Sequence, residues 1–183
     1  MATTTLIVLS VISLLTMLTY VISTACVSIR KNGHLPSSVS STYYLLCQKH
    51  KWIFGAVLIA CALLVCPAIL QVTPDPFTFM AFISAVGLMM IGTAPNFNDK
   101  FEFKIHATGA FILWAFGHLW ASLMISTYGF LQLWIAFFAC VLYGMLVKKM
   151  TWDDMRVMFY GELITICTIY GTLFYKLISI LLA

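Results

Sequence analysis

Ionisable side chains inside long apolar segments are the residues of this sequence best suited to chemistry. Glu162 and Lys176 lie in the last apolar segment, and His118 lies in an earlier one. An ionisable group at the centre of a membrane-spanning helix costs about 2.5–3.5 kcal/mol, so such groups usually face a polar cavity or one another. We therefore expect Glu162, His118 and Lys176 to recognise a bound ligand.

The last apolar segment, residues 157–182, has a polar face. At 100° per residue its polar and small side chains fall within an arc of about 120°. These are Gly161, Glu162, Thr165, Thr168, Thr172 and Lys176. The helical rise separates Glu162 from Lys176 by about 21 Å, so the two charges share a face without touching.

Two other segments carry polar stripes, and the three together predict a groove. Residues 105–127 place His106, Ala110, Trp114, Gly117, His118, Ala121 and Ser122 on one side. Residues 5–28 do the same with Ser13, Thr16, Tyr20, Ser23 and Thr24. If these three helices enclose a groove, Tyr20, Trp114 and Thr165 join the three ionisable residues as ligand-binding side chains. The alternative is that the polar side chains of these stripes only stabilise helix packing through interhelical hydrogen bonds. Each such bond contributes roughly 0.6–2 kcal/mol.

A second cluster, with different chemistry, precedes the helix expected over 105–127. Asp99, Glu102 and His106 stand at i, i+3 and i+7, a spacing that lets carboxylates and an imidazole bind a divalent metal or act as acid and base. A solvated helix start, with acids near the positive end of the helix dipole, explains the same pattern. A serine cluster at 37–41 has no nearby histidine that spacing nominates as a base.

Known cofactor and catalytic motifs are missing from the sequence. It contains no GxSxG, HExxH, Walker or GxGxxG pattern. His106 and His118 are twelve residues apart, hence about 18 Å apart along a helix, too far to serve one haem. We therefore expect no cofactor.

Composition identifies the protein class. The 183 residues are 62% hydrophobic and 9% charged, and the mean hydropathy is +1.01. The surface of a soluble domain needs roughly 25% charged residues, so residues 1–183 are expected to form a single membrane domain. The net charge of +4 does not indicate a nucleic-acid partner, because no basic stripe with interleaved aromatics lies outside the apolar segments.

The apolar segments predict an all-α, polytopic helical bundle with about six transmembrane helices, each near the 20 residues that cross a hydrocarbon core. Their expected bounds are 5–28, 52–70, 77–93, 105–127, 130–147 and 157–182. Between the first two, Ser37 is expected to cap a short helix on the membrane surface. Lys and Arg collect after the first, third and fifth segments, which predicts cytoplasmic basic loops, both termini outside, and a multi-pass protein of the inner (plasma) membrane.

Two stretches resemble a known group of proteins. LPSSVSSTYYLL (35–46) and IGTAPNFNDKFEFKIHATGA (91–110) look like segments of uncharacterised bacterial six-helix membrane proteins, which are distantly similar to DRAM-like families. The matching positions are Pro36, Ser37, Gly92, Pro95 and His106. The resemblance implies six helices in one bundle and no settled activity, although the eukaryotic relatives are linked to lipid distribution. Zinc hydrolases of the ceramidase and adiponectin-receptor type need a late His-x-x-x-His, and this chain has no histidine after His118.

Three functional hypotheses follow. The first is a non-enzymatic protein that binds or translocates a lipid or small polar solute through the groove. The second is a membrane-embedded hydrolase or metal enzyme that uses Asp99, Glu102 and His106 at the cytoplasmic face. The third is an accessory subunit that docks a partner membrane protein or a second copy through Gly117 and Ala121, whose small side chains allow close helix approach.

Overall fold

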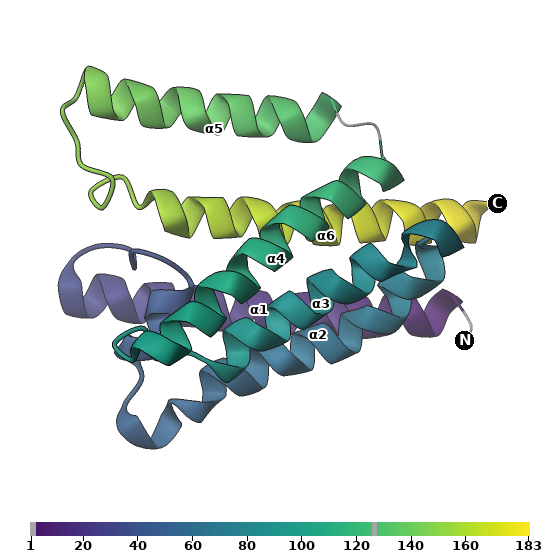
Figure 1. Ribbon diagram of the computed structural model, residues 1–183, viewed down its shortest axis with the longest axis horizontal. Coiled ribbons are helices and arrows are strands. Elements are labelled where there is room, and N and C mark those ends of the chain that lie inside the picture. Colours follow the sequence, from purple (N-terminus) through teal and green to yellow (C-terminus); the bar gives the residue numbers. More distant parts are fainter. Residues whose placement is uncertain (1–2, 126–127) are drawn as a thin grey trace.

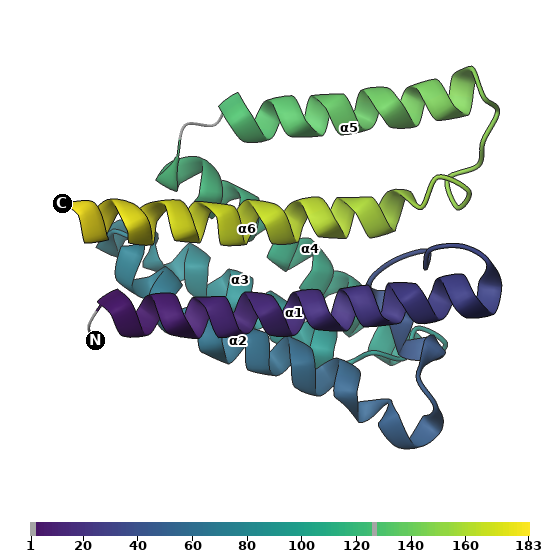
Figure 2. The same ribbon diagram turned by 180° about the vertical axis from the view of Figure 1, so that it is seen from behind.

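The computed structural model describes residues 3–125 and 128–183, and this part of the chain is helical without any strand (Figure 1). The elements are α1 (Thr3–Asn32), η1 (Ser40–Leu45), η2 (Gln48–His50), α2 (Trp52–Val72), η3 (Asp75–Phe77), α3 (Thr78–Thr93), α4 (Lys100–Met124), α5 (Tyr128–Leu146) and α6 (Val157–Leu182). The long helices run along one common direction, α4 crosses the others obliquely, and the N- and C-termini lie at the same end (Figures 1 and 2).

The fold class predicted from the sequence, an all-α membrane bundle, is confirmed. In the described residues, five helical stretches are long and apolar enough to cross a membrane: Thr3–Asn32, Gln48–Val72, Asp75–Thr93, Lys100–Met124 and Val157–Leu182. Helix α5 contributes a shorter apolar stretch, Trp134–Leu146, so a sixth span remains a prediction. Large apolar side chains such as Ile22 and Leu63 are about 60% exposed, as expected for helices that face lipid, where every backbone group must bond internally.

Local signals explain where the helices depart from the predicted bounds. Helix α4 begins at Lys100 because the Asp99 carboxylate accepts hydrogen bonds from the amides of Phe101 and Glu102, both at 2.9 Å, which satisfies two donors of the first turn. The expected surface helix capped by Ser37 is wrong in its start and its type. A 3-10 helix begins at Ser40 instead, and the residue before it, Val39, makes no side-chain cap bond.

Close glycine contacts join α4 to its neighbours. A Cβ on Gly109 would lie 2.7 Å from the Gly87 carbonyl oxygen of α3, and a Cβ on Gly117 would lie 2.7 Å from Ile169 of α6. Small residues at these positions let the helices touch. Ala121 is fully buried as well. The small-residue face of α4 is thus covered by this chain's own helices, and a partner at Gly117 and Ala121 would have to displace α6.

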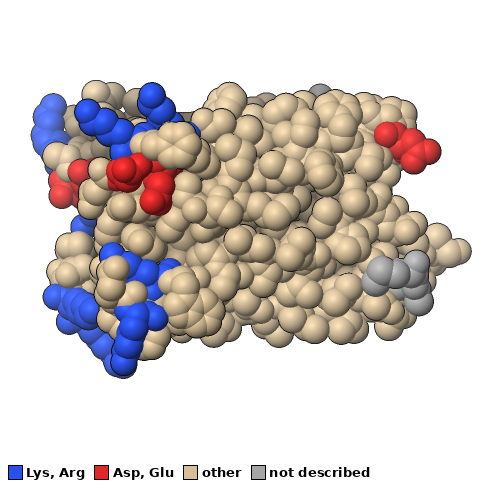
Figure 3. All heavy atoms as spheres, turned by 60° about the horizontal axis from the view of Figure 1, so that its bottom comes forward, with Lys and Arg blue, Asp and Glu red and all other residues tan. Residues whose placement is uncertain are grey.

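The charged side chains are distributed unevenly over the surface. On the face shown in Figure 3, Lys and Arg gather at one end of the bundle together with acidic residues, an acidic group lies at the other end, and the central zone is uncharged. The end with Lys and Arg is the one where α1 leads into η1, α3 into α4 and α5 into α6, opposite the two termini (Figure 1). The uncharged zone between the two ends is the part of the surface suited to hydrocarbon.

Candidate functional site

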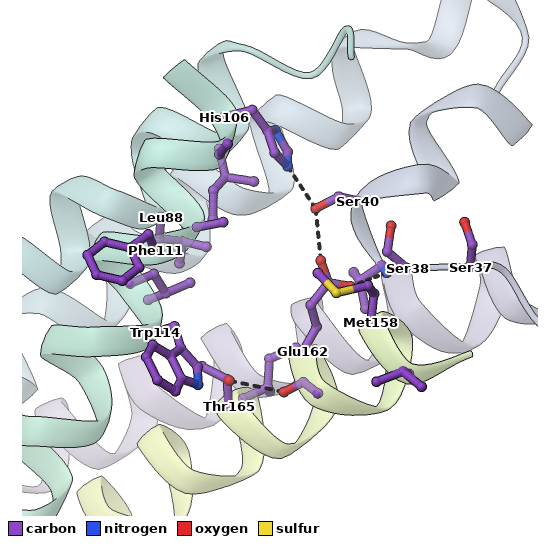
Figure 4. A pocket seen from close by; sticks show the side chains of 18 of the residues that line it. Ser37, Ser38, Ser40, Leu88, His106, Phe111, Trp114, Met158, Glu162 and Thr165 are labelled. Atoms are coloured by element: carbon purple, nitrogen blue, oxygen red, sulfur yellow. Dashed lines mark hydrogen bonds between the residues drawn. The ribbon is translucent and has the colours of Figure 1, made fainter. Parts of the chain in front are cut away.

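Three residues from separate elements form a hydrogen-bonded polar cluster near the basic end: Glu162 of α6, Ser40 of η1 and His106 of α4 (Figure 4). The Ser40 hydroxyl oxygen lies 3.1 Å from Glu162 Oε1 and 3.1 Å from His106 Nε2. The amide of Val39 donates to the second carboxylate oxygen, Glu162 Oε2. Ser40 therefore joins a carboxylate to an imidazole that lies 56 positions earlier in the chain.

The segment before η1 is fixed to α6 by its backbone. The Phe159 amide, in the first turn of α6, has no partner inside its own helix and donates to the Ser37 carbonyl at 3.1 Å. Ser38 and Ser41 stabilise the turn reciprocally, because the amide of each donates to the hydroxyl oxygen of the other, at 3.1 and 2.8 Å. These bonds hold Ser40 against Glu162.

The orientation of His106 fixes the position of one of its protons. Nδ1 lies 3.0 Å from the Ala94 carbonyl oxygen, and because a carbonyl only accepts, Nδ1 must carry a hydrogen. The ring is 6% exposed, and Phe97 packs against it edge-on with the centroids 4.4 Å apart. Nε2 therefore faces Ser40 as either a lone pair or a second N–H.

Hydrogen-bond accounting shows that the polar cluster shares one proton. Ser40 has a single hydroxyl hydrogen, but it lies between two groups that both need a bond. Both bonds form only if one neighbour supplies a proton. Either His106 is doubly protonated and Glu162 ionised, or Glu162 is protonated and His106 neutral. In both arrangements the net charge of the cluster is zero, which lowers the cost of burying it.

A cavity of about 720 Å³ lies beside the polar cluster, within the size range of small-molecule sites. Its walls come from α4, α5, α6 and residues 37–40, and its floor comes from α1, α2 and α3. Most of the lining is apolar and aromatic, including Phe111, Trp114, Trp134 and Phe137. In Figure 4, Glu162 and Thr165 of α6 face Trp114 and His106 of α4 across this space.

The α5 side of the cavity is lightly packed. On α5, Leu131 and Ile135 are 55% and 59% exposed, whereas Trp134 turns toward the cavity. Phe111 and Met158 line the cavity and are themselves 65% and 54% exposed. The mouth of the cavity therefore lies on the apolar surface that faces lipid.

The structure divides the six predicted ligand-binding residues into two groups. Glu162, Trp114 and Thr165 line the cavity beside the polar cluster. His118 lies outside its lining, Lys176 lies toward the far end of α6, and the Tyr20 hydroxyl lies 2.7 Å from Thr42 Oγ1 in the packed core. The groove predicted between residues 5–28, 105–127 and 157–182 is thus formed differently: α5 joins α4 and α6 as its walls, and α1 contributes only Met17 to its floor.

His118 is nevertheless placed next to the cavity wall. Its Nδ1 lies 2.8 Å from the Trp114 carbonyl oxygen, and its ring centroid lies 5.2 Å from that of Trp134. His118 Nε2 and Trp134 Nε1 are buried and have no hydrogen-bond partner in the part of the chain that is described. One of these atoms can accept a hydrogen bond and the other can donate one.

Part of the polar stripe of α1 is interhelical packing. Ser13 Oγ lies 2.5 Å from the Tyr170 hydroxyl and donates to the Cys61 carbonyl at 3.0 Å, and Ser13 is fully buried. Thr24 is satisfied by carbonyls of its own helix. The Ser13 bonds link α1 to α2 and α6. The other stripe residues, Thr16, Tyr20, Ser23 and Thr24, line a second pocket beside α2, so no α1 hydroxyl lies in the lining of the cavity beside Glu162.

The side chains proposed for a metal do not converge. Within the residues described, no group of three or more His, Cys, Asp or Glu could hold an ion. Asp99 caps α4, Glu102 accepts from the Asn96 amide at 2.9 Å, and His106 turns inward to Ala94 and Ser40. The metal interpretation of Asp99, Glu102 and His106 is therefore not supported by their geometry.

The pairing of Ser40 with His106 is the part of the site that the sequence did not predict. The two residues are 66 positions apart, and no periodicity relates a serine of a connecting segment to a histidine of another helix. No protein-family model, curated protein or solved structure matches this chain. Its function therefore has to be argued from the site.

Proposed function

We propose that this protein binds a membrane amphiphile, with the polar group against Glu162, Ser40 and His106 and the apolar part in the cavity between α4, α5 and α6. The observation that carries the proposal is the position of a buried, hydrogen-bonded polar cluster at the edge of an apolar, lipid-facing cavity. Few convergent polar groups in an otherwise apolar pocket are typical of sites that orient a small ligand.

Selectivity in such a site has to come from the polar cluster. A hydrocarbon tail is about as well solvated in the bilayer as among aromatic and aliphatic side chains, so moving it into the cavity gains little. Hydrogen bonds and charge contacts in a low dielectric are worth more, particularly when one partner is ionised. Glu162 and His106 therefore decide which polar group is retained.

Binding is favoured over translocation by the extent of the cavity. From α6 the cavity takes residues between Val157 and Ile166 only, all in the half of the helix nearest the basic loops. Translocation of the same ligand would need a second opening toward the termini. Following the positive-inside rule, we place the basic end in the cytoplasm and the protein in the plasma membrane. The cavity then opens toward the lipids of the cytoplasmic leaflet.

The test is ligand retention. Wild-type protein and Glu162→Gln are purified into nanodiscs, and the co-purified small molecules are extracted and compared by mass spectrometry. Glu102→Gln is the matched control, because it makes the same change at a carboxylate outside the cavity lining. We expect a species that wild type and Glu102→Gln retain and Glu162→Gln loses. Identical extracts from all three proteins would contradict the proposal.

A second candidate, an acyl hydrolase, is favoured by one observation. His106 Nδ1 is fixed by the Ala94 carbonyl, which aims Nε2 at the Ser40 hydroxyl, as a general base is aimed at a nucleophile. It ranks second because Glu162 competes for the same hydroxyl and occupies the Val39 amide, a donor that would otherwise suit an oxyanion. If a lipophilic fluorophosphonate labels the wild-type protein covalently and fails to label Ser40→Ala, acyl hydrolysis would become the better-supported function.

A further inference from the structure

The cavity has a charge character opposite to that of the loops around it. Of the ten Lys and Arg residues of the chain, nine lie in or near the loops at the end of the bundle where the cavity lies (Figure 3), and Lys176 lies toward the far end of α6. None of them is among the described residues that line the cavity, whereas the carboxylates of Glu162 and Asp153 are. A site for a phosphate or carboxylate headgroup would normally present Arg or Lys. The lining therefore disfavours an anionic ligand.

Aromatic rings provide the rest of the lining in a form suited to a cation. Trp114 and Trp134 stand nearly perpendicular, at 87° with centroids 6.3 Å apart, and Trp134 meets Phe137 at 86° and 5.5 Å. All three line the cavity. Ring faces attract cations through their quadrupole, most strongly for tryptophan and away from water. Aromatic rings that share a cavity with a carboxylate are suited to an organic cation.

Only a few side chains of the cavity lining can take up or release a proton. They are His106 on α4, Glu162 on α6 and Asp153 in the exposed loop before α6. The described lining residues of α1, α2, α3, α5 and the 37–40 segment include no titratable side chain. Only the polar cluster, which holds one shared proton in a bonded arrangement, can therefore change its protonation deep in the cavity.

We infer that the cavity binds a lipophilic organic cation in exchange for the proton that Glu162 and His106 share through Ser40. Before binding, the cluster is neutral. On binding, one N–H bond of His106 or the O–H bond of Glu162 breaks and its proton leaves to water at the basic end. Glu162 is then ionised and accepts from Ser40, and the cation balances the carboxylate. His106 is neutral with its hydrogen on Nδ1, so the hydrogen bond between Ser40 and His106 is lost in this state. The inference rests on the proposed function and specifies its ligand.

The experiment uses two probes of equal shape and opposite charge, tetraphenylphosphonium and tetraphenylborate. Binding to wild-type protein in nanodiscs is followed by tryptophan fluorescence and by titration calorimetry near neutral pH in two buffers of different ionisation enthalpy. We expect the phosphonium to bind with release of about one proton. The borate should bind about tenfold more weakly or worse, and a tenfold difference in affinity corresponds to about 1.4 kcal/mol of binding free energy.

Variants separate the two parts of the inference. Glu162→Gln should abolish proton release and weaken phosphonium binding, whereas Asp153→Asn should weaken binding but keep proton release. Glu102→Gln should change neither. The wild-type buffer comparison keeps the test decisive even if a variant misfolds.

Each of the remaining outcomes would refute one part of the inference. Equal binding of both probes in the cavity would refute cation selectivity and leave amphiphile binding intact. Phosphonium binding without proton release would refute the exchange. Failure of both probes to bind would refute the inference, while the extraction experiment with Glu162→Gln still decides the proposed function on its own.

Discussion

Replacing Ser40 by alanine removes the hydroxyl that joins Glu162 to His106. The change breaks two hydrogen bonds of 3.1 Å, each contributing about 1 kcal/mol net. It also leaves a ring nitrogen and a carboxylate oxygen without that partner, at an additional cost of about 1–3 kcal/mol. Since His106 is only 6% exposed, water does not readily replace the lost bond. We therefore expect Ser40→Ala to lower the free energy of unfolding by about 3–5 kcal/mol.

The assay is equilibrium unfolding in mixed micelles titrated with a denaturing detergent and followed by circular dichroism. Ser179→Ala is the control, because the Ser179 hydroxyl is exposed and donates only to the Tyr175 carbonyl of its own helix, at 2.7 Å. Its effect should stay within about 0.5 kcal/mol.

A double-mutant cycle gives the stricter test. Ser40→Ala and Glu162→Gln belong to one hydrogen-bonded network, so their effects should be non-additive by about 0.5–3 kcal/mol. If Ser40→Ala destabilises no more than Ser179→Ala, or if the cycle is additive, the polar cluster is not bonded as described and the proton accounting fails with it.

Three further predictions concern packing, topology and the loop before α6. Gly109→Ala should destabilise by about 1–3 kcal/mol, because its Cβ would lie 2.7 Å from an α3 carbonyl oxygen. Gly171→Ala, with nothing within 4 Å, should be neutral or stabilising in the same unfolding assay. Cys47, exposed between η1 and η2, should react with a membrane-impermeant maleimide in inside-out vesicles but not in right-side-out cells, and the reverse pattern would invert the proposed topology. The Thr151 side chain and backbone hydrogen bonds lower the pKa of Asp154, so this contact stabilises the fold above the usual aspartate pKa and is lost as pH falls. Thr151→Val should raise the pKa of Asp154 toward its ordinary value in an NMR titration, and an unchanged titration would contradict the contact.

The helical bundle was predictable because its signals are local. Apolar segments near 20 residues define membrane helices by length alone, and five of them meet that criterion in the described chain. Glu162, Trp114 and Thr165 were also predicted as ligand-facing residues, and all three line the cavity. For Glu162 the reason is physical, since a carboxylate in an apolar helix needs partners.

The arrangement of helices around the cavity was not predictable from periodicity. A polar stripe shows which face of a helix is buried but not which helix covers it. The α1 stripe was predicted to line the groove, but Ser13 bonds to Cys61 and Tyr170 inside the bundle, and aromatic side chains of α5 form that wall instead. Ser40 was missed for a related reason: its partner His106 is brought to it by tertiary packing of α4 and not by spacing.

The most direct test of the central claim is a high-resolution structure of the wild-type protein in a lipid bilayer, inspected in the cavity between α4, α5 and α6. We expect density for a bound amphiphile in contact with Trp114 and Trp134, with its polar group within hydrogen-bonding distance of Glu162. A cavity filled by the protein's own α5 side chains, with Glu162 bonded only to Val39 and Ser40, would contradict amphiphile binding and leave the polar cluster as a clamp that fixes residues 37–40 to α6.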